Sequence, residues 1–425
     1  MKVLVIGQGG REHAIVWKLL QSPRVSRVYC APGNGGIAQD AVCVPIPETD
    51  FAALAQFAKD QGIDFTVVGP EAALFGGVVN FFQRRGLAVV GPTREAAEIE
   101  GSKAFAKQLM QRYDIPTAQS AIFTRYEEAV RFLREQERPW VVKADGLAAG
   151  KGVVVPETVE EAEAALRQMM VEKVFGAAGE RVVLEERLYG EELSLMAFVD
   201  GETVVPMVPA QDHKPVYDGD KGPNTGGMGT YSPVPQMSPE QVEECVERVL
   251  KPAAKAMVAE GRPFRGVLYA GLMMAPGGPK VIEFNARFGD PETQVVLPRL
   301  KTDLVEVFQA MLMGQLSQLE VEWSEEAAVC VILSSAGYPG PYEKGKPISG
   351  LEEAGENALL FHAGTAWREG QMMSNGGRVL GVTALGSDLS RAQRLSYESV
   401  RRIYFEGMHY RRDIAAKALM GDGRV

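Results

Sequence analysis

Residues 2–10 read Lys-Val-Leu-Val-Ile-Gly-Gln-Gly-Gly, a short apolar run followed directly by a glycine-rich turn. Such a run bounded by turn residues is typical of a buried strand. A helix is expected at about 13–21, and the strand–helix order then recurs as far as residue 92. Further strands and helices are expected at 28–30, 51–60, 65–68, 74–85 and 88–90. This βαβ order predicts a parallel, doubly wound sheet with a ligand crevice at the carboxyl ends of its strands.

The remainder of the chain is expected to form α+β regions, so the fold class is multidomain α/β and α+β. Ser102 is a candidate N-cap for a helix at 103–113. A polar loop is expected at 211–230 and a helix at 239–260. The last hundred residues are expected to hold strands at 328–334 and 379–385 and a helix at 390–402. The expected domains are 1–100, 101–325 (with a mobile subdomain at about 117–190) and 326–425.

Composition narrows the class of protein. At 425 residues the chain exceeds one ordinary core, and 46% hydrophobic with 24% charged residues is typical of a soluble globular protein. The balance of 45 basic against 55 acidic residues argues against a nucleic-acid partner but allows a local positive pocket. The 4 cysteines lack Cys-x-x-Cys spacing, which favours free thiols in a reducing compartment. With no apparent signal peptide or membrane span, we expect a cytoplasmic protein that does not bind membranes.

The segment 281–293, Val-Ile-Glu-Phe-Asn-Ala-Arg-Phe-Gly-Asp-Pro-Glu-Thr, carries the clearest chemistry. In a strand, Glu283 and Asn285 fall on one face, and Arg287 continues that polar side. A carboxylate and an amide oxygen suit a magnesium ion, and a guanidinium suits a phosphoryl oxygen. The alternative is an edge strand whose polar side chains are merely solvated.

Two glycine-rich loops invite comparison with nucleotide-binding motifs. The first, at 7–12, has Glu12 where a dinucleotide fingerprint needs a small residue, and residues 29–33 offer no ribose-binding acid. A nicotinamide cofactor is therefore not expected. The free amides of this turn suit an anion such as a sugar phosphate, although a purely structural turn is an equally good interpretation.

The second loop, at 143–153, resembles a P-loop but fails the spacing, because only three residues separate Gly146 from Gly150 and Gly152 replaces the required Ser or Thr. Lys143 and Lys151 accompany these glycines, which favours a flap that closes over phosphates rather than a surface hairpin.

Taken together, these segments resemble the phosphoribosylamine–glycine ligase family, the glycinamide ribonucleotide synthetases, which are ATP-grasp enzymes of purine biosynthesis. The resemblance covers essentially the whole chain. It rests on Gly-Gln-Gly-Gly-Arg-Glu-His-Ala at 7–14, Gly-Pro-Glu at 69–71, the loop at 143–153, Gln-Asp-His-Lys at 211–214, Gly-Pro-Asn-Thr-Gly-Gly-Met-Gly at 222–229, the segment 282–293 and Asn-Gly-Gly-Arg-Val-Leu at 375–380.

The resemblance implies an N-terminal substrate domain, a central ATP-grasp that holds ATP between two sheets, and a small C-terminal domain. It implies ligation of glycine to 5-phosphoribosylamine with conversion of ATP to ADP and phosphate, through a glycyl phosphate. The implied partners are these small molecules with Mg²⁺ or Mn²⁺, and a monomer is expected. Activation by phosphoryl transfer needs positioning and electrostatics rather than a nucleophilic triad.

The resemblance also assigns roles to residues on the nucleotide side. Lys103 and Lys143 would contact the ATP phosphates, with 145–152 as the flap over them, open without nucleotide. The adenine hinge would be Glu185-Glu186-Arg187-Leu188, acting largely through its backbone. Glu192 would take the ribose hydroxyls, with Glu191 as the alternative. The implied nucleotide contacts are Lys103, Lys143, Gly146, Gly150, Lys151, Gly152, Glu185, Glu186, Leu188 and Glu192.

On the substrate side, Gly9, Gly10 and Arg11 would help to hold the phosphoribosylamine. Glu283 and Asn285 would bind the metal ion. The catalytic residues would be Arg287, which stabilises the transferring phosphoryl group, and Asp290, which orients an amine. His13 and His213 are interpreted as structural residues.

One departure concerns the metal. ATP-grasp relatives commonly carry a second metal-binding carboxylate on the preceding strand, but residues 268–274 read Leu-Tyr-Ala-Gly-Leu-Met-Met. We therefore expect the ion to bind mainly as a complex with the ATP phosphates, unless Asp212 or Asp290 completes its shell. Two other functions stay open: a different ATP-grasp carboxylate–amine ligase, and a nucleotide sensor that needs neither Glu283 nor Arg287.

Overall fold

The structure, a computed structural model, describes residues 1–136, 138–146 and 152–421. The N-terminal region is built on a five-stranded sheet of order β3-β2-β1-β4-β5, in which every pair is parallel. Its strands are β1 (Lys2–Gly7), β2 (Arg27–Pro32), β3 (Val42–Cys43), β4 (Phe65–Val68) and β5 (Val89–Val90). The order reverses between β1 and β4, so the expected doubly wound sheet is confirmed and its crevice lies at the carboxyl ends of those two strands.

Helices cover both faces of this sheet. They are α1 (Gly10–Leu20), α2 (Ile37–Asp40), α3 (Phe51–Gln61), α4 (Glu71–Gly76) and α5 (Val78–Gln83). The single helix expected at 74–85 is wrong, because Gly77 adopts φ +88, which ends α4 and starts α5. Far along the chain, α13 (Leu304–Leu312) also packs here, and the rings of Phe65 and Phe308 are 6.1 Å apart.

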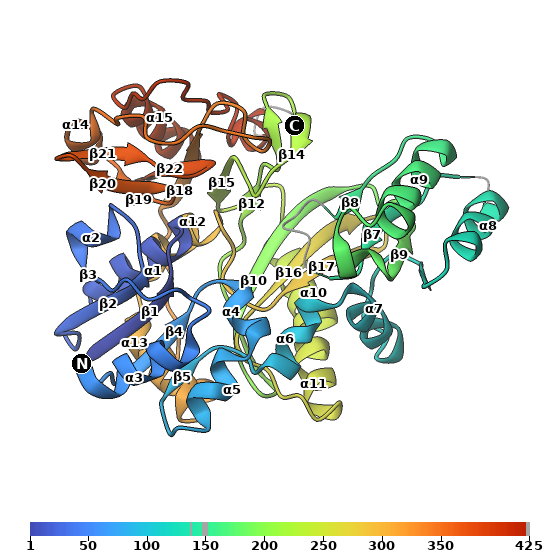
Figure 1. Ribbon diagram of the computed structural model, residues 1–425, viewed down its shortest axis with the longest axis horizontal. Coiled ribbons are helices and arrows are strands. Elements are labelled where there is room, and N and C mark those ends of the chain that lie inside the picture. Colours follow the sequence, from blue (N-terminus) through green and yellow to red (C-terminus); the bar gives the residue numbers. More distant parts are fainter. Residues whose placement is uncertain (137, 147–151, 422–425) are drawn as a thin grey trace.

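The central region contains two four-stranded sheets, one of which lies at the end of the molecule far from the N-terminal sheet in Figure 1. That outer sheet has the order β6-β9-β7-β8, and α8 and α9 pack beside it. The side chains of Phe132 and Trp140 meet in its core with ring centroids 4.9 Å apart. The elements are β6 (Ser120–Phe123), α8 (Tyr126–Gln136), β7 (Val141–Ala144), β8 (Val153–Val154), α9 (Val159–Leu166) and β9 (Val182–Glu185).

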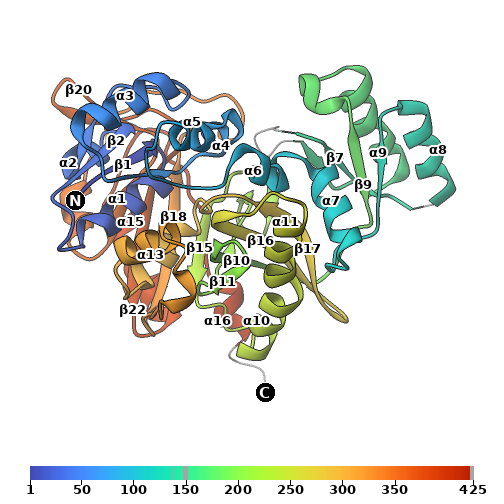
Figure 2. The same cartoon turned by 90° about the horizontal axis from the view of Figure 1, so that it is seen from below.

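The second central sheet is antiparallel, with the order β11-β10-β16-β17. The helical segment from α10 (Pro239–Cys245) to α11 (Lys251–Ala259) lies along it, as Figure 2 shows from below. Between the sheets runs α7 (Lys103–Arg112), which contacts β9 and β17 and is N-capped by Ser102 as expected. The strands are β10 (Glu191–Asp200), β11 (Thr203–Pro206), β16 (Arg265–Ala275) and β17 (Gly278–Asn285).

A third sheet, of order β12-β15-β18-β22-β19, joins strands from both sides of residue 326. The polar loop expected at 211–230 is wrong, because this stretch contains two strands of the sheet and a separate hairpin. Asp218-Gly219 is a strong hairpin signal, and the sheet partner of β15 lies a hundred residues away. The strands are β12 (Gln211–Asp212), β13 (Pro215–Tyr217), β14 (Lys221–Asn224), β15 (Gly229–Ser232), β18 (Ala327–Ser334), β19 (Leu359–His362) and β22 (Arg378–Gly386).

Three more helices complete the frame of the site. α6 (Arg94–Gly101) precedes α7, α12 (Thr293–Arg299) packs against α1, and α15 (Leu389–Val400) packs on β18 and β22. Figure 1 shows the C-terminal sheet above the N-terminal one, with α12 nearby. Across the described ranges, we find no helix with the length and apolar character that crossing a bilayer requires.

Candidate active site

Buried lysines dominate the space between the two central sheets. Lys143, on β7, places its Nζ 3.0 Å from Glu185 Oε2 and 3.1 Å from the backbone oxygen of Ile282. Lys107, on α7, lies 3.0 Å from the same carboxylate oxygen. No local motif marks Lys107, yet it is as buried as Lys143. Burial outweighs the attraction of Glu185 and lowers the pKa of Lys107 to about 8.

Lys103 begins α7 and faces the glycine loop. Its Nζ is 3.5 Å from the backbone oxygen of Gly146. Burial lowers the pKa of Lys103, although the charge of Glu283 acts in the opposite direction.

Asp145 fixes one end of the glycine loop. Its carboxylate accepts a hydrogen bond from Ser102 Oγ at 3.1 Å and pairs with Arg181. At the other end, the Gly152 oxygen accepts a hydrogen bond from Ala144 N at 2.8 Å. The base of the expected flap is thus held by α7 and β7. Residues 147–151 of the expected flap lie outside the described residues. They include two of the expected phosphate contacts, Gly150 and Lys151.

Glu283 and Asn285 lie two residues apart on β17 and share a face. Burial favours the neutral form of Glu283, but four surrounding cations outweigh it and lower the pKa of this carboxyl. Ordered by the size of their effect, they are Lys214, Lys143, Lys103 and Arg287. An ionised carboxylate beside an amide oxygen fits a hard divalent ion. Among residues 1–136, 138–146 and 152–421, no group of three or more His, Cys, Asp or Glu side chains is arranged to hold a metal.

The expected adenine hinge follows β9 directly. Glu186 lies 3.7 Å from Arg138, and Leu188 is half-buried. Glu192, at the start of β10, is exposed, and its Oε2 is 3.7 Å from Lys214 Nζ. The expected ribose ligand therefore already has a lysine at its side.

Arg287 lies between two carboxylates that the sequence did not mark as catalytic. Its Nη2 is 3.0 Å from Glu100 Oε1, and its Nε is 3.4 Å from Glu71 Oε2. Glu100 also accepts a hydrogen bond from Ala286 N at 2.7 Å. Burial opposes the charge of Arg287, but Glu100 and Glu71 raise its pKa above the ordinary value. The guanidinium is therefore charged and held from α4 and α6.

Arg11 approaches Glu71, one of the two carboxylates beside Arg287, from α1. Its Nε is 2.6 Å from Glu12 Oε1, its Nη1 is 3.9 Å from Glu71 Oε2, and Nη1 donates to the oxygen of Phe288 at 3.2 Å. Arg11 and Arg287 thus share Glu71 at the crevice between β1 and β4. This places the expected substrate ligand Arg11 next to the expected catalytic Arg287.

The glycine turn before α1 is partly self-bonded. Gly9 N donates to Glu12 Oε2 at 2.6 Å, so one of the amides expected to bind an anion already has a carboxylate partner. A Cβ on Gly10 would lie 2.6 Å from Gln294 Nε2 of α12, so a larger residue there would displace that side chain. The turn therefore has a structural role in addition to any role in binding.

The C-terminal region reaches the site through Arg378, at the start of β22. Its Nη1 is 3.4 Å from Asp290 Oδ1 and donates to the backbone oxygens of Asp290 at 2.9 Å and Gly226 at 2.7 Å. Gln294 Nε2 donates to Asp290 Oδ1 at 2.8 Å. Burial favours protonation of Asp290, but Arg378 and Arg11 outweigh it and lower its pKa. Asp290 is therefore an ionised group held by three elements.

A further acidic cluster includes Asp212. Burial, reinforced by the charge of Glu292, raises the pKa of Asp212 well above its ordinary range. Glu292 Oε1 accepts hydrogen bonds from Tyr269 at 2.6 Å and from Ser194 at 3.1 Å. A bound cation would itself favour the ionised form of Asp212, so this residue stays a candidate to complete the metal shell.

The two histidines have structural partners. His13 lies 2.8 Å from Asp40, and its Nδ1 accepts a hydrogen bond from the backbone of His362 at 2.8 Å. His213 lies 3.2 Å from the oxygen of Gly229, and burial lowers its pKa to about 4. These contacts support their interpretation as structural residues.

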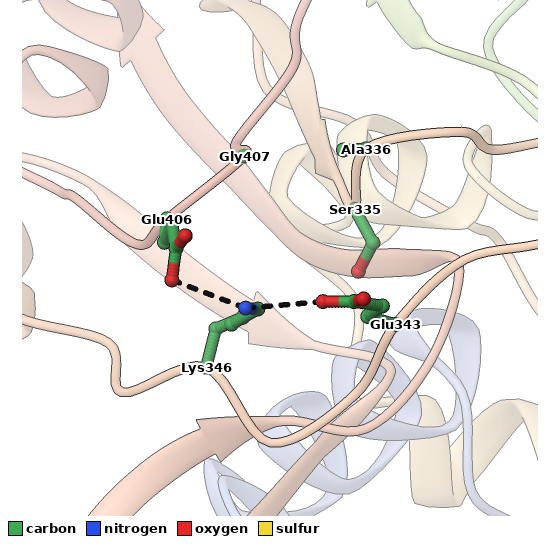
Figure 3. Close-up of a pocket in the computed structure, with 6 residues that line it drawn as sticks. All are labelled: Ser335, Ala336, Glu343, Lys346, Glu406 and Gly407. Carbon is green, nitrogen blue, oxygen red and sulfur yellow. Dashed lines mark hydrogen bonds and ion pairs between the residues drawn. The ribbon is translucent and has the colours of Figure 1, made fainter.

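A pocket elsewhere in the C-terminal region shows a different kind of chemistry. There Lys346 lies 3.1 Å from Glu343 and 3.1 Å from Glu406, beside Ser335 (Figure 3). Both carboxylates are largely exposed, so these are solvated ion pairs of small energetic value. We assign no function to this pocket.

Two sheets enclose a group of lysines, and one of these sheets carries the carboxylate of Glu283 and the amide of Asn285. This arrangement defines an ATP-grasp protein. Family models bear this out. Phosphoribosylglycinamide synthetase matches as its N domain over residues 1–100, its ATP-grasp (A) domain over 101–293 and its C domain over 328–417. The chain belongs to the phosphoribosylglycinamide synthetase family.

Individual relatives agree. A phosphoribosylamine–glycine ligase of Halalkalibacterium halodurans is 57% identical over 419 residues, which cover 99% of this chain and 97% of the relative. One from Vibrio cholerae is 51% identical, covering 99% of each chain. The crystal structure of the Thermotoga maritima phosphoribosylamine–glycine ligase superposes with a TM-score of 0.86 at 35% identity, covering 98% of this chain and 100% of that one. Biotin carboxylase of Campylobacter jejuni, at 14% identity and a TM-score of 0.72, shares the fold.

Proposed function

We propose that this chain joins glycine to 5-phosphoribosylamine at the expense of ATP, giving glycinamide ribonucleotide, ADP and phosphate. The lysines between the two central sheets, among them Lys103 beside the glycine loop and Lys143 on β7, carry the proposal, because a polyphosphate needs such positive charge. Membership of the family and the names of relatives that span the whole chain support the choice of substrates.

In the proposed reaction, an oxygen of the glycine carboxylate attacks the γ-phosphorus of ATP, and the bond to the β-phosphate oxygen breaks. Lys103 and Lys143 bind the phosphates, and the hinge at 185–188 receives the adenine. Glu192 takes the ribose hydroxyls. Arg287 stabilises the charge of the transferring group, since a guanidinium presents two donors to phosphoryl oxygens.

The amine of phosphoribosylamine then attacks the carbonyl carbon of glycyl phosphate, and phosphate leaves. Gly9, Gly10 and Arg11 hold the sugar phosphate, and Asp290 orients the amine. The crevice between β1 and β4 opens beside Arg11 and Arg287, which supports this order of groups. The attacking amine loses a proton, and ionised Asp290 is a suitable acceptor.

A divalent ion, Mg²⁺ or Mn²⁺, belongs to this proposal. Glu283 and Asn285 would hold it, and it would supply positive charge to the phosphate oxygens. We further propose that the enzyme acts as a cytoplasmic monomer, with functional divisions at 1–100, 101–325 and 326–425.

The direct experiment is one incubation of the enzyme with ATP, Mg²⁺, glycine and freshly generated phosphoribosylamine, followed by mass spectrometry of the products. A glycine-containing ribonucleotide is expected, in amounts equal to the ADP formed. ADP without such a product would overturn the proposal. Replacing glycine by alanine or β-alanine distinguishes the proposed function from the second candidate. That candidate is another carboxylate–amine ligase, which would favour a different acid.

A further inference from the structure

Lys107 is a buried cation that the proposed mechanism does not use. It lies on α7, and only 2% of it is exposed. A lysine at this depth costs free energy unless its ammonium group has partners. Its pKa of about 8 still leaves it mostly protonated at pH 7, so the interior holds a charge. Packing alone does not explain this choice of residue, because a methionine would fill similar space without the charge.

The carboxylate that pairs with Lys107 is shared with Lys143. In the outer sheet, Lys143 on β7 lies opposite Val183 on β9, two residues before Glu185. Lys143 and Glu185 are therefore diagonal neighbours on one face of this sheet. The Nζ atoms of Lys143 and Lys107 each lie 3.0 Å from the same oxygen, Glu185 Oε2. One carboxylate oxygen thus divides its attraction between a lysine of β7 and a lysine of α7.

The two lysines also reach β17, the strand that carries the proposed metal ligands. Lys143 Nζ donates a hydrogen bond to the oxygen of Ile282 at 3.1 Å. Lys107 Nζ donates to Thr117 Oγ1 at 2.6 Å, and that hydroxyl donates to the oxygen of Val281 at 2.7 Å. The shared carboxylate, α7 and β17 are therefore joined in one buried network around the ammonium group of Lys143.

Binding of ATP places two demands on Lys143. In the proposed mechanism its ammonium group binds a phosphate, but it also pairs with Glu185. A turn toward the phosphate weakens that pair, and a buried carboxylate that loses its partner is strongly unfavourable. Because Lys107 pairs with the same oxygen, Glu185 keeps one cation after Lys143 has turned. The second lysine therefore lowers the free energy needed to release the first.

We propose that Lys107 is a positioning residue for Lys143: it holds Glu185, so that Lys143 is free to bind the phosphates of ATP. Lys107 itself does not contact the nucleotide, because Glu185 and Thr117 engage two of its three donors. No covalent bond forms or breaks in this role, and no proton is transferred. The inference rests on the proposed function for the use of ATP and adds to it a residue that acts on nucleotide binding.

The test measures binding of a non-hydrolysable ATP analogue with Mg²⁺ to the full-length enzyme at pH 7 by calorimetry. In Lys107→Met, the analogue must draw Lys143 away from a carboxylate that has lost its other lysine. We expect the dissociation constant to rise by about 100-fold, part of the cost of leaving a buried charge unpaired. At saturating ATP, kcat should fall by less than about threefold, because Lys143 then lies on the phosphates as in wild type.

Removal of the carboxylate should suppress the defect. Lys107→Met combined with Glu185→Gln keeps the backbone of the adenine hinge and leaves no charge at position 185 to hold Lys143. Its affinity for the analogue should return to within about tenfold of wild type. The double variant has no unpaired buried carboxylate, so it decides the question even if Lys107→Met does not fold. If Lys107 served only the fold, or contacted the nucleotide directly, the double variant would bind about 100-fold more weakly than wild type, and the proposal would be overturned.

Lys280→Met is the control for the loss of charge. Lys280 lies on β17, is half-buried, and is close enough for its charge to lower the pKa of Lys107. This variant loses one positive charge but keeps both ion pairs of Glu185. Its affinity for the analogue should stay within about threefold of wild type. An equal loss of affinity in Lys280→Met and Lys107→Met would mean that general attraction acts on the nucleotide, which would overturn the positioning role.

The proposed function and the positioning role can fail separately. If wild type binds the analogue but forms no glycine-containing ribonucleotide, the proposed function fails, and the variants still measure the role of Lys107. If the ribonucleotide forms while Lys107→Met binds the analogue like wild type, the positioning role alone fails. A wild-type enzyme that does not bind the analogue overturns both.

Discussion

The two halves of the site balance charge in opposite ways. On the nucleotide side, lysines share carboxylates: Lys107 and Lys143 both pair with one oxygen of Glu185, and the charges of Lys103, Lys143 and Lys214 act together on Glu283. On the substrate side, each arginine is already paired: Arg11 with Glu12, Arg287 with Glu100, and Arg378 with Asp290. The first half is prepared to receive an anion. On the substrate side, the arginines must exchange their carboxylate partners for the substrate. Binding there therefore depends on the strength of those ion pairs.

Among the tests of this comparison, the substitution Arg287→Lys should have the largest effect on activity. The lysine keeps the charge but cannot bridge Glu71 and Glu100 while presenting two donors to a phosphoryl oxygen. We expect a loss of roughly 2–4 kcal/mol in transition-state stabilisation, measured from kcat/KM, with Mg-ATP affinity largely kept. The control is Arg134→Lys, which alters only an exposed pair with Glu163. Near-normal turnover would mean that Arg287 serves the fold alone.

The contribution of Lys107 to the pH dependence of stability tests the nucleotide side. Its folded pKa of about 8 lies below the ordinary 10.5, so the unfolded chain binds more protons between these values and stability rises with pH across that window. Relative to Lys107→Met, wild type should gain up to about 3 kcal/mol in the free energy of unfolding from below pH 8 to above pH 10.5. Urea unfolding of both proteins at the two ends of the window measures this. A constant difference would show that the ion pair with Glu185 cancels the cost of burial.

Arg378→Met addresses the substrate half. It removes the hydrogen bonds to Gly226 and Asp290 and leaves the carboxylate of Asp290 with fewer partners. We expect the KM for glycine or phosphoribosylamine to rise by about tenfold, corresponding to 1–2 kcal/mol for a charged hydrogen bond, with the KM for ATP nearly unchanged. Steady-state kinetics with each substrate varied in turn provides the measurement. Arg394→Met, on the exposed side of α15, is the control; a rise in the KM for ATP alone would reverse the assignment of the two halves.

The smallest expected signal is for metal binding to the free enzyme. Glu283 and Asn285 offer too few ligands to strip water from Mg²⁺, and nearby lysines repel the ion. Calorimetric titration of nucleotide-free protein at sub-millimolar Mg²⁺ should show negligible heat, and binding should appear once a non-hydrolysable ATP analogue is present. A tight stoichiometric site without nucleotide would show that another carboxylate completes the shell.

The sequence predicted those parts of the molecule that depend on local pattern. The N-terminal βαβ order, the cap at Ser102 and the shared face of Glu283 and Asn285 each follow from neighbouring residues. The break at Gly77 depends on one left-handed residue that a helical pattern does not reveal. The strands within 211–230 depend on partners such as β18, far along the chain.

The same distinction holds in the site. Lys143 was recognisable beside its glycines, whereas Lys107 meets Glu185 only through the packing of α7 against β9. The partners Glu71 and Glu100 of Arg287 lie about two hundred residues away from it, and nothing near Arg287 in the sequence points to them. Motifs therefore locate functional groups, but their charge partners come from tertiary contacts.

The packing of α13 under the N-terminal sheet has a consequence for how the protein is made. Val3, Val5 and Phe65 bury one side of the first strands against Phe288 and Phe308. During synthesis, Ile15, Val16 and Leu19 of α1 can cover part of this side early, but α13 follows only after most of the chain has emerged. Until α13 arrives, the nascent N-terminal third therefore keeps part of this apolar surface exposed.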